Sequence, residues 1–313
     1  ADIDRDGWLD FITIEMLGRD HTRHLNQFSP MNPVPRTPGL IQDREEIARN
    51  ALFRNRGDNT YAEIAWFSGV AATDWSWTPI FVDVDLDGFE DLLISNGHMH
   101  DVNDRDVKEA RDADTSARPR IDRKVVLRYP RLEPPKAAFR NRGDLTFEDA
   151  ADAWGFNSRQ IGHGMALADL DNDGDLDVAA NCENALPLIY RNESPAPRLA
   201  VRLKGRAPNT QGIGGRITLL GGPVTQSQEI LCGGRYLSGD DPMRVFAAGS
   251  TTNKLRLEVT WRDGKKSILN DLRANCLYEV DEAGAVADVG RAGETVNRRV
   301  EESRKKELGH IPF

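Results

Sequence analysis

The sequence predicts an all-β protein, and three observations lead to that prediction. A repeated unit recurs along the first two thirds of the chain, and short apolar segments flank acidic turns within it. The last third alternates apolar and polar residues between glycines. Alternation with a period of two is typical of strands, and closely spaced turn signals favour many short strands over helices.

The repeat is most visible in the hexapeptide FRNRGD, which occurs at Phe53–Asp58 and at Phe139–Asp144, 86 positions apart. Three further identities align at the same offset without a gap: Thr60 with Thr146, Ala65 with Ala151 and Gly69 with Gly155. An acidic nonapeptide begins thirty residues after each phenylalanine. The hexapeptide therefore belongs to a structural repeat whose core is about 47 residues long.

Three acidic nonapeptides share aspartate at positions 1, 3, 5 and 9 and glycine at position 6. They are DIDRDGWLD at Asp2–Asp10, DVDLDGFED at Asp83–Asp91 and DLDNDGDLD at Asp169–Asp177. Hard cations such as calcium take about six to eight oxygen ligands around a sharply turned backbone. Aspartates at alternate positions of such a turn point inward together, and the glycine permits the reversal. The pattern therefore predicts three calcium ions, one in each loop.

The predicted ligands are twelve carboxylates and the backbone carbonyl at position 7 of each loop. The carboxylates are those of Asp2, Asp4, Asp6, Asp10, Asp83, Asp85, Asp87, Asp91, Asp169, Asp171, Asp173 and Asp177, and the carbonyls are those of Trp8, Phe89 and Asp175. An EF-hand is excluded, because position 12 is not glutamate and the flanking residues are strand-like. The alternative is three ordinary acidic turns, since aspartate and glycine favour turns without an ion.

Hairpins of the form FRNRGDxTF, together with DxDxDGxxD loops, resemble the FG-GAP (VCBS) repeats of calcium-bearing β-propellers. The resemblance covers Asp2 to about Asn192. It implies propeller blades in which calcium is structural rather than catalytic. About four to eight blades close such a ring, and about three are visible here. The resemblance thus implies a partial ring, whose other blades lie upstream of Ala1 or on another chain.

The residues from about Pro197 predict a compact antiparallel β-sandwich. The stretches NTQGIGGRI, GGRYLSGDD and LEVTWRDG resemble the ASPIC/UnbV domain, although this chain has FAAG where relatives commonly have FGLG. We therefore predict blades at 1–195, with polar insertions at 16–50 and 98–136, and a β domain at 196–283. A charged, helical tail is predicted at 284–313, and a short helix is predicted from Asp43.

The two RGD tripeptides have two interpretations. Each can be the turn of a tight hairpin, in which glycine adopts a positive φ. Each can instead be an adhesion ligand, which would need a mobile exposed loop. We favour the turn, because the tripeptide recurs as a fixed part of the repeat.

Composition excludes some partners. The net charge of −9 argues against nucleic acid, because phosphate binding needs a basic face. No stretch approaches the roughly 18–20 apolar residues of a membrane span. The three cysteines form no CxxC pair, and Cys232 and Cys276 either form a disulfide or remain free, buried thiols.

These features predict a non-enzymatic, extracellular or periplasmic scaffold, stabilised by calcium, that binds a protein or glycan and can be a subunit of a larger assembly. The alternative is an enzyme or biosynthesis accessory protein, because some FG-GAP propellers are polysaccharide lyases and UnbV is named after a biosynthetic gene cluster. No catalytic motif is visible. His98, His100 and Asp101 form either a metal or acid–base cluster or part of a solvated loop. Convergence of His98, His100, His163 and arginine or lysine residues on one pocket beside a calcium would favour the enzyme, whereas scatter would favour the scaffold.

Overall fold

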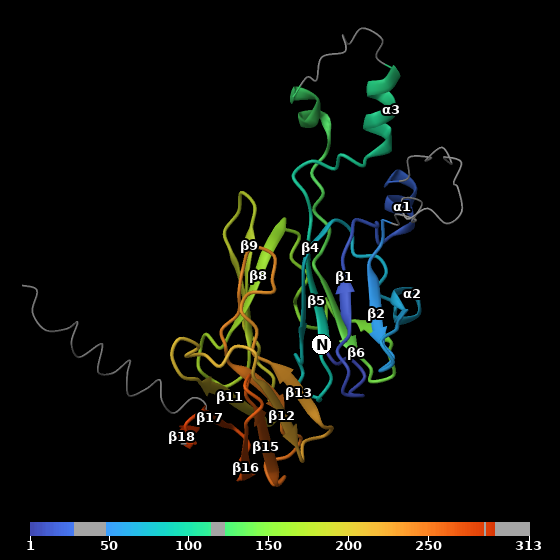
Figure 1. The fold of residues 1–313 in the computed structure, drawn as a ribbon. Helices are drawn as coiled ribbons and strands as arrows, with labels where there is room; N and C mark the ends of the chain where they lie inside the picture. Colours follow the sequence, from blue (N-terminus) through green and yellow to red (C-terminus); the bar gives the residue numbers. More distant parts are fainter. Residues whose placement is uncertain (28–47, 114–122, 285, 292–313) are drawn as a thin grey trace, which may run out of the picture.

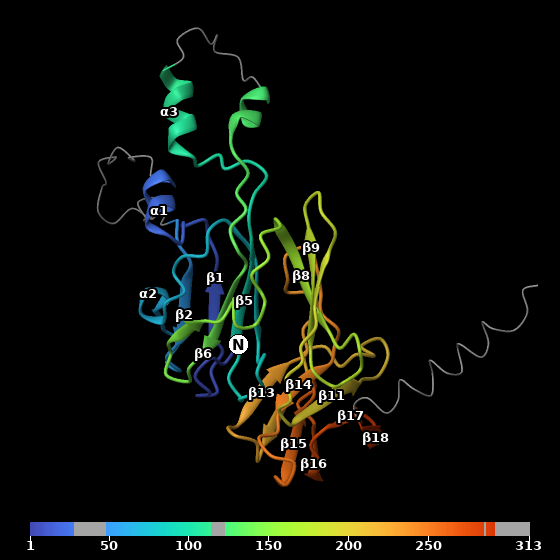
Figure 2. The ribbon, with the colours of Figure 1, turned by 180° about the vertical axis from the view of Figure 1, so that it is seen from behind.

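The computed structural model describes residues 1–27, 48–113, 123–284 and 286–291, which form five β-sheets and a few short helices. Figure 1 shows three N-terminal sheets in the middle of the molecule, helical insertions at one end and the C-terminal strands at the other. The view from behind in Figure 2 shows the same order. The predicted all-β class is confirmed.

The three N-terminal sheets are antiparallel meanders, in which strands adjacent in sequence are adjacent in space. The first contains β1 (Phe11–Thr13), β2 (Ala51–Asn55) and β3 (Tyr61–Glu63); the second contains β4 (Ser76–Val82), β5 (Asp91–Asn96), β6 (Ala137–Asn141) and β7 (Phe147–Asp149); the third contains β8 (Gly162–Ala168), β9 (Asp177–Cys182) and β10 (Leu188–Tyr190). Acidic loops join β4 to β5 and β8 to β9, and the first acidic loop precedes β1. The FRNRGD hairpins join β2 to β3 and β6 to β7.

The second sheet lies between the other two, because its central strand β5 is buried on both faces. Leu92 and Ile94 belong to a core shared with the first sheet, and Leu93 belongs to a core shared with the third. Successive side chains of a strand point to opposite faces, so this division follows from the strand geometry. Such stacking of small sheets is propeller-like, and none of the described sheets closes into a barrel.

The insertions in the first and second sheets are partly helical. The connection from β1 to β2 contains α1 (His21–Gln27), and that from β5 to β6 contains α3 (Arg105–Ala113) and the 3-10 helix η2 (Arg123–Arg128); α2 (Ala65–Ser68) follows β3. Arg23 of α1 forms ion pairs with Asp74 at 2.5 Å and with Asp101 at 3.2 Å, so the two insertions are tied together. The helix predicted from Asp43 lies outside the described residues.

The C-terminal strands form a sandwich of two four-stranded sheets. In spatial order, one contains β14 (Arg244–Ala247), β11 (Arg198–Lys204), β17 (Cys276–Asp281) and β18 (Val286–Arg291), and the other contains β13 (Gln226–Glu229), β12 (Arg216–Leu220), β15 (Leu255–Thr260) and β16 (Lys266–Leu272). Side chains of both sheets, including Leu199, Ile217, Phe246, Leu257 and Val280, share one core.

Several details of this region differ from the prediction. β11 and β17 are parallel, because the chain crosses to the other sheet before it returns. The helical tail is wrong at its start: a turn with Gly284 at φ 97° reverses the chain, and β18 then pairs with β17. Residues 292–313 lie outside the described residues. The disulfide interpretation is also wrong, because Cys276 is buried, Cys232 is exposed and both are free.

The RGD tripeptides are hairpin turns, as predicted. Gly57 and Gly143 have φ of 75° and 73°. The carboxylates of Asp58 and Asp144 each accept a hydrogen bond from a backbone N–H within the same hairpin, that of Thr60 or Thr146, at 3.0 Å. These carboxylates are therefore engaged within their own turns.

Both hairpins pack against an acidic loop. A Cβ atom at Gly143 would lie 3.1 Å from the ring of Phe89, and one at Gly57 would lie 2.7 Å from Nε1 of Trp8. The glycines are thus required twice, for the positive φ and for the close approach of the loop residue at position 7.

We expect Gly143→Val to lower the free energy of unfolding by about 1–3 kcal/mol through backbone strain, with an added cost for displacing Phe89. The matched control is Gly264→Val, because Gly264 has φ 87° and nothing within 4 Å of an added Cβ. Urea unfolding of both variants would measure the difference. Equal losses in the two variants would show that Phe89 does not restrain the hairpin.

Candidate metal centres

The three acidic loops share one backbone conformation. Position 6 is a glycine with positive φ in each, and position 4 is also left-handed although it is not glycine. The φ values are 60°, 57° and 63° for Arg5, Leu86 and Asn172, and 91°, 104° and 95° for Gly7, Gly88 and Gly174. Two left-handed residues fold each nonapeptide back on itself. The sequence analysis anticipated the glycine but not position 4.

This fold brings three carboxylates of each loop together, with ligand oxygens within 4.8 Å of one another. The groups are Asp2, Asp4 and Asp6; Asp83, Asp85 and Asp91; and Asp169, Asp171 and Asp177. Asp10, Asp87 and Asp173 lie in the same loops but outside these groups. For all twelve carboxylates, and for the carbonyls of Trp8, Phe89 and Asp175, a ligand role stays a prediction.

The carboxylate at position 9 connects each loop to the strand beside it. Asp91 accepts hydrogen bonds from the backbone N–H of Val84 and of Asn141, both at 2.8 Å. Asp10 accepts from Ile3 and Asn55 at 2.9 and 2.7 Å, and Asp177 accepts from Leu170 and Asn192, both at 2.8 Å. One side chain therefore holds the start of each loop to the C-terminal end of a strand, which is β2 for the first loop, β6 for the second and β10 for the third.

The same asparagines link each loop to the preceding one. Nδ2 of Asn141 donates to the carbonyl of Ile3 at 2.8 Å, and Nδ2 of Asn192 donates to the carbonyl of Val84 at 2.9 Å. Arg5 adds a bond from Nε to the carbonyl of Gly88 at 2.6 Å. The three loops are thus one connected row.

The carboxylate at position 3 of each loop is paired with an arginine that precedes the linking asparagine. Nε of Arg54, Arg140 and Arg191 lies 2.5, 2.6 and 2.6 Å from a carboxylate oxygen of Asp4, Asp85 and Asp171. The sequence analysis missed these arginines. The tripeptide YRN at Tyr190–Asn192 is a third copy of FRN, which could have been recognised but for its different offset from the earlier copies.

The loops fit a hard divalent cation. Oδ1 of Asp2, Asp4 and Asp85 is buried and has no hydrogen-bond partner, and Asp2 is only 3% exposed. Burial raises the pKa of Asp169 to about 6, of Asp83 to about 7 and of Asp91 to about 9. Buried carboxylates without compensation are costly. A divalent cation bound by these oxygens would remove that cost, so the residues present suit such an ion.

The second and third loops also contact the C-terminal sandwich. Leu86, at position 4 of the second loop, is 4% exposed and packs with Ala200, Met243 and Val245. Arg198, the first residue of β11, forms ion pairs with Asp173 at 3.1 Å and Asp175 at 3.4 Å. Burial raises the pKa of Asp175 to about 8, and Arg198 opposes that shift.

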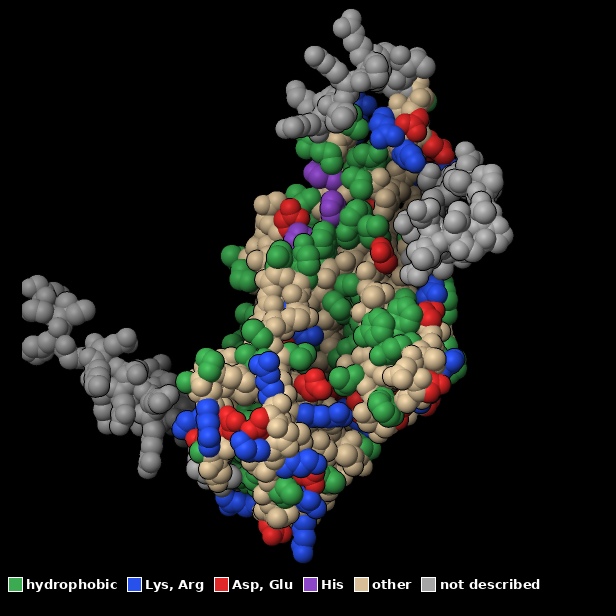
Figure 3. Space-filling model, in the orientation of Figure 1, with side chains coloured by type: hydrophobic (Ala, Val, Ile, Leu, Met, Phe, Trp, Pro, Cys, Tyr) green, Lys and Arg blue, Asp and Glu red, His purple; other side chains and the backbone are tan. Residues whose placement is uncertain are grey.

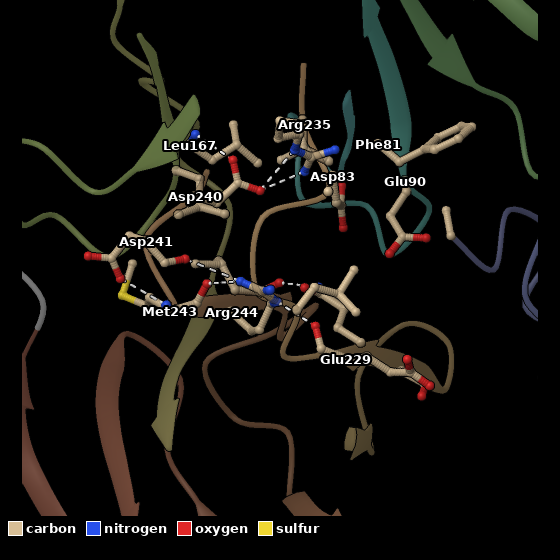
Figure 4. A pocket seen from close by; sticks show the side chains of 18 of the residues that line it. Phe81, Asp83, Glu90, Leu167, Glu229, Arg235, Asp240, Asp241, Met243 and Arg244 are labelled. Atoms are coloured by element: carbon tan, nitrogen blue, oxygen red, sulfur yellow. Dashed lines mark hydrogen bonds and ion pairs between the residues drawn. The ribbon is translucent and has the colours of Figure 1, made fainter. Parts of the chain in front are cut away.

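A pocket lies at this junction (Figure 4). Asp83 and Glu90 line it from the second loop, and Glu229, Asp240 and Arg244 line it from the sandwich. Arg235 is paired with Asp240 at 2.7 Å, and Arg244 donates to the carbonyls of Glu229 and Asp241. Because its arginines are already engaged and its remaining charges are acidic, this pocket between the two halves does not suit an anion.

The histidines named in the sequence analysis lie at the opposite end of the strands. Nδ1 of His98 lies 2.6 Å from the carbonyl oxygen and 3.1 Å from the backbone nitrogen of His100, while Asp101 pairs with Arg23. His98, His100 and Asp101 do not form a metal cluster among the described residues. His98 and His163 do meet, because both contact the ring of Trp77, with centroid distances of 6.0 and 4.5 Å.

A buried lysine, also missed by the sequence analysis, lies beneath these rings. Lys136 is 0% exposed, and Nζ donates to the carbonyl of Asn96 at 3.0 Å and to that of Gln160. Burial lowers its pKa to about 8. Its bonds to Asn96, the last residue of β5, and to Gln160, two residues before β8, hold the second and third sheets together. No carboxylate pairs with it among the described residues.

Comparisons with known proteins support the family resemblances. The model of the FG-GAP-like repeat matches residues 134–180, which contain the second hairpin and the third acidic loop. The model named ASPIC and UnbV matches residues 205–287. No curated protein shows significant sequence similarity to the chain.

One solved structure with a detectable likeness is that of a candidate cell adhesion protein from Bacteroides ovatus ATCC 8483. It is 11% identical, and the likeness covers 55% of this chain and 81% of that chain with a TM-score of 0.17, so we draw nothing from it. No described helix has the length and apolar character needed to cross a membrane. The chain therefore carries an FG-GAP-like repeat followed by an ASPIC/UnbV domain.

Proposed function

We propose that the protein is a non-enzymatic, calcium-stabilised scaffold that binds a protein or glycan partner outside the cytoplasm. The observation that carries the proposal is the threefold group of carboxylates with ligand oxygens within 4.8 Å of one another. A single acidic turn would say little. Three loops with the same backbone, the same arginine and the same asparagine argue for a common ligand.

The FG-GAP-like match supports an extracellular or periplasmic location. Calcium sites of modest affinity fit such a location as well, because the calcium concentration outside cells is high enough to fill them. The net charge of −9 and the acidic loops disfavour nucleic acid as partner. We place the division between the two parts near residue 196, between the third sheet and β11.

The enzyme alternative lacks a supporting geometry among the described residues. His98 and His163 converge on Trp77, but at the end of β4 and β8 that is remote from the acidic loops. Neither histidine contacts a serine, threonine or cysteine side chain in a nucleophile–base pair. Catalysis beside calcium is therefore less well supported than a scaffold.

We expect three calcium ions per chain, counted by native mass spectrometry, and a lower melting temperature when a chelator replaces calcium. Binding to the folded state alone adds about 2.7 kcal/mol at a hundredfold excess over the dissociation constant. Asp85→Asn should remove one ion, whereas the control Asp144→Asn, in a hairpin turn, should retain three. Superimposed melting curves with calcium and with chelator would rule out the stabilising role.

Arg140→Gln should widen the gap between the melting temperatures with calcium and with chelator. Arg140 pairs with Asp85 and Asp87, so it offsets charge that calcium offsets when bound. The pair is partly exposed, so we expect a loss of about 0.2–1 kcal/mol in chelator and a smaller loss in calcium.

The control for this experiment is Arg142→Gln, because Arg142 pairs only with Glu148 on the surface among the described residues. It should leave the gap unchanged. If the difference between the two melting temperatures becomes smaller in Arg140→Gln, the main role of Arg140 is to orient the Asp85 carboxylate for calcium. It would then contribute less by offsetting negative charge when the ion is absent.

The effect of calcium should grow with pH between about 5 and 8. Burial raises the folded-state pKa values of Asp83, Asp91 and Asp169, so the ion-free folded chain holds protons that the unfolded chain releases. Its free energy of unfolding therefore falls as pH rises, while calcium binding favours ionised carboxylates. Melting curves at several pH values would test this, and a calcium effect that shrinks with pH would contradict it.

A further inference from the structure

We propose that an aromatic cluster at the end of the sheets remote from the acidic loops binds a neutral saccharide. The cluster consists of Trp75, Trp77, His98, His163 and Tyr236. This inference rests on the proposed partner-binding function and narrows the partner to one chemical class at one site. The site combines residues from both halves of the chain.

Three rings of the cluster, those of Trp75, Trp77 and His98, are nearly parallel, whereas His163 and Tyr236 are tilted against Trp77 by 56° and 41°. Trp75 and His98 stack at 4.1 Å with 25° between planes, and Trp77 lies 6.0 Å from His98 at 12°. Tyr236 contacts Trp77 at 5.3 Å. Saccharide rings have apolar C–H faces, which pack against the electron-rich faces of aromatic rings, while their hydroxyl groups point outward. An aromatic surface of this kind is suited to such a ligand.

Polar groups suited to sugar hydroxyls surround the rings. The carboxylate of Glu183, a side chain that is 36% exposed, lies beside His163, with Oε2 3.6 Å from Nε2. Because this Nε2 is itself buried, the carboxylate of Glu183 is the group of the pair that can accept a hydrogen bond from a sugar hydroxyl. Tyr236 is 40% exposed, so its hydroxyl is accessible. Nδ1 of His98 is engaged with the backbone of His100, so Nε2 is the ring nitrogen left for a hydroxyl, as a donor or an acceptor according to the tautomer. A small number of polar groups placed beside apolar rings is typical of sites that bind small molecules.

Figure 3 shows histidine side chains at the surface among hydrophobic side chains, at this end of the sheets. All the rings of the cluster are half-buried or exposed. The cluster is therefore a surface, and not part of the core.

The cluster is held in place before any ligand arrives. Nε1 of Trp77 donates to the carbonyl of Gly97 at 2.7 Å. The carbonyl of His163 accepts from the hydroxyls of Thr78 at 2.7 Å and Ser95 at 2.6 Å. Side chains that are already ordered lose little entropy on binding.

Tyr236 reaches the cluster on a segment of the ASPIC/UnbV domain that lies along β8. Ser238 Oγ donates to the carbonyl of Met165 at 2.7 Å, and the N–H of Asp241 donates to the carbonyl of Leu167 at 2.8 Å. The glycine-rich stretch GGRYLSGDD, which the sequence analysis used only as a family feature, thus carries a ring onto the FG-GAP side.

Charge favours a neutral ligand over an acidic one. The carboxylate of Glu183 lies beside His163, and the protein has a net charge of −9. The nearest ammonium, that of Lys136, is buried and bonded to backbone carbonyls, so it is not available to a uronate or sulfate.

The test is a titration of the calcium-loaded protein with tetrasaccharides of glucose, mannose, galactose and N-acetylglucosamine, followed by tryptophan fluorescence and calorimetry. Tetragalacturonate is the acidic comparison. We expect at least one neutral tetrasaccharide to bind with a dissociation constant of about 1 mM or lower, and tetragalacturonate to bind less tightly.

Trp77→Ala should weaken binding at least about tenfold. Glu183→Gln and Tyr236→Phe, which alter accessible polar atoms and preserve packing, should each weaken it by about threefold or more. The matched control is Trp66→Ala, since Trp66 is 61% exposed on α2 and makes no contact with the cluster. It should leave the affinity unchanged.

Three results would overturn the site: no binding of any neutral tetrasaccharide at about 20 mM, unchanged affinity in Glu183→Gln and Tyr236→Phe, or preference for tetragalacturonate. If no saccharide binds the cluster but a peptide or protein does, the partner belongs to that class and the saccharide proposal is wrong. The melting temperatures of the same variants with calcium and with chelator test the scaffold proposal separately from the saccharide proposal. A variant can lose saccharide binding and still be stabilised by calcium.

Discussion

The hydrogen bonds accepted by the ninth-position carboxylate of each acidic loop are the contacts on which the N-terminal sheets depend. Asp91 is fully buried and satisfies two backbone N–H groups, one at the start of its own loop and one at the end of β6. Bonds from backbone amides to a carboxylate are stronger than those between neutral groups. Without this side chain, two buried donors would lose their partner and the loop would separate from the strand beside it.

The same arrangement creates the electrostatic difficulty of the fold. Each loop gathers carboxylates in a small volume, and the asparagine bridges bring the loops into one row. Arg54, Arg140 and Arg191 each offset part of one carboxylate's charge. Arg198 adds two ion pairs at the third loop, where the chain leaves for β11 in place of a hairpin. These arginines leave several buried carboxylate oxygens without partners, which is why a divalent cation suits the loops.

The parts of this fold that were predictable from the sequence are those set by local pattern. The nine-residue spacing of Asp2–Asp10 and its two counterparts placed every acidic loop, and the recurrence of FRNRGD placed both hairpins. The left-handed conformation of Arg5, Leu86 and Asn172 has no common residue type, so the sequence carried no signal for it.

Contacts between distant residues account for the rest. The parallel pairing of β11 with β17 depends on chain crossing, which an alternating pattern does not encode. Trp77 meets His163 only because β4 lies beside β8, and Tyr236 joins them only because the two halves of the chain are in contact. The YRN tripeptide before β11 was overlooked because the connection from β9 to β10 is much shorter than the two insertions before it.

β4 and β8 relate the two ends of the molecule, since each begins at the aromatic cluster and ends at an acidic loop. The ASPIC/UnbV domain contacts both ends, through Leu86 in the second loop and through the segment that carries Tyr236 along β8. A rigid sandwich fixed at two points on the same sheets restricts how those sheets move against each other. Order imposed at the acidic loops therefore extends to the spacing of Trp77, His163 and Tyr236. On this argument the acidic loops need not contact a partner, because they influence the aromatic cluster by fixing the positions of the strands that carry its rings.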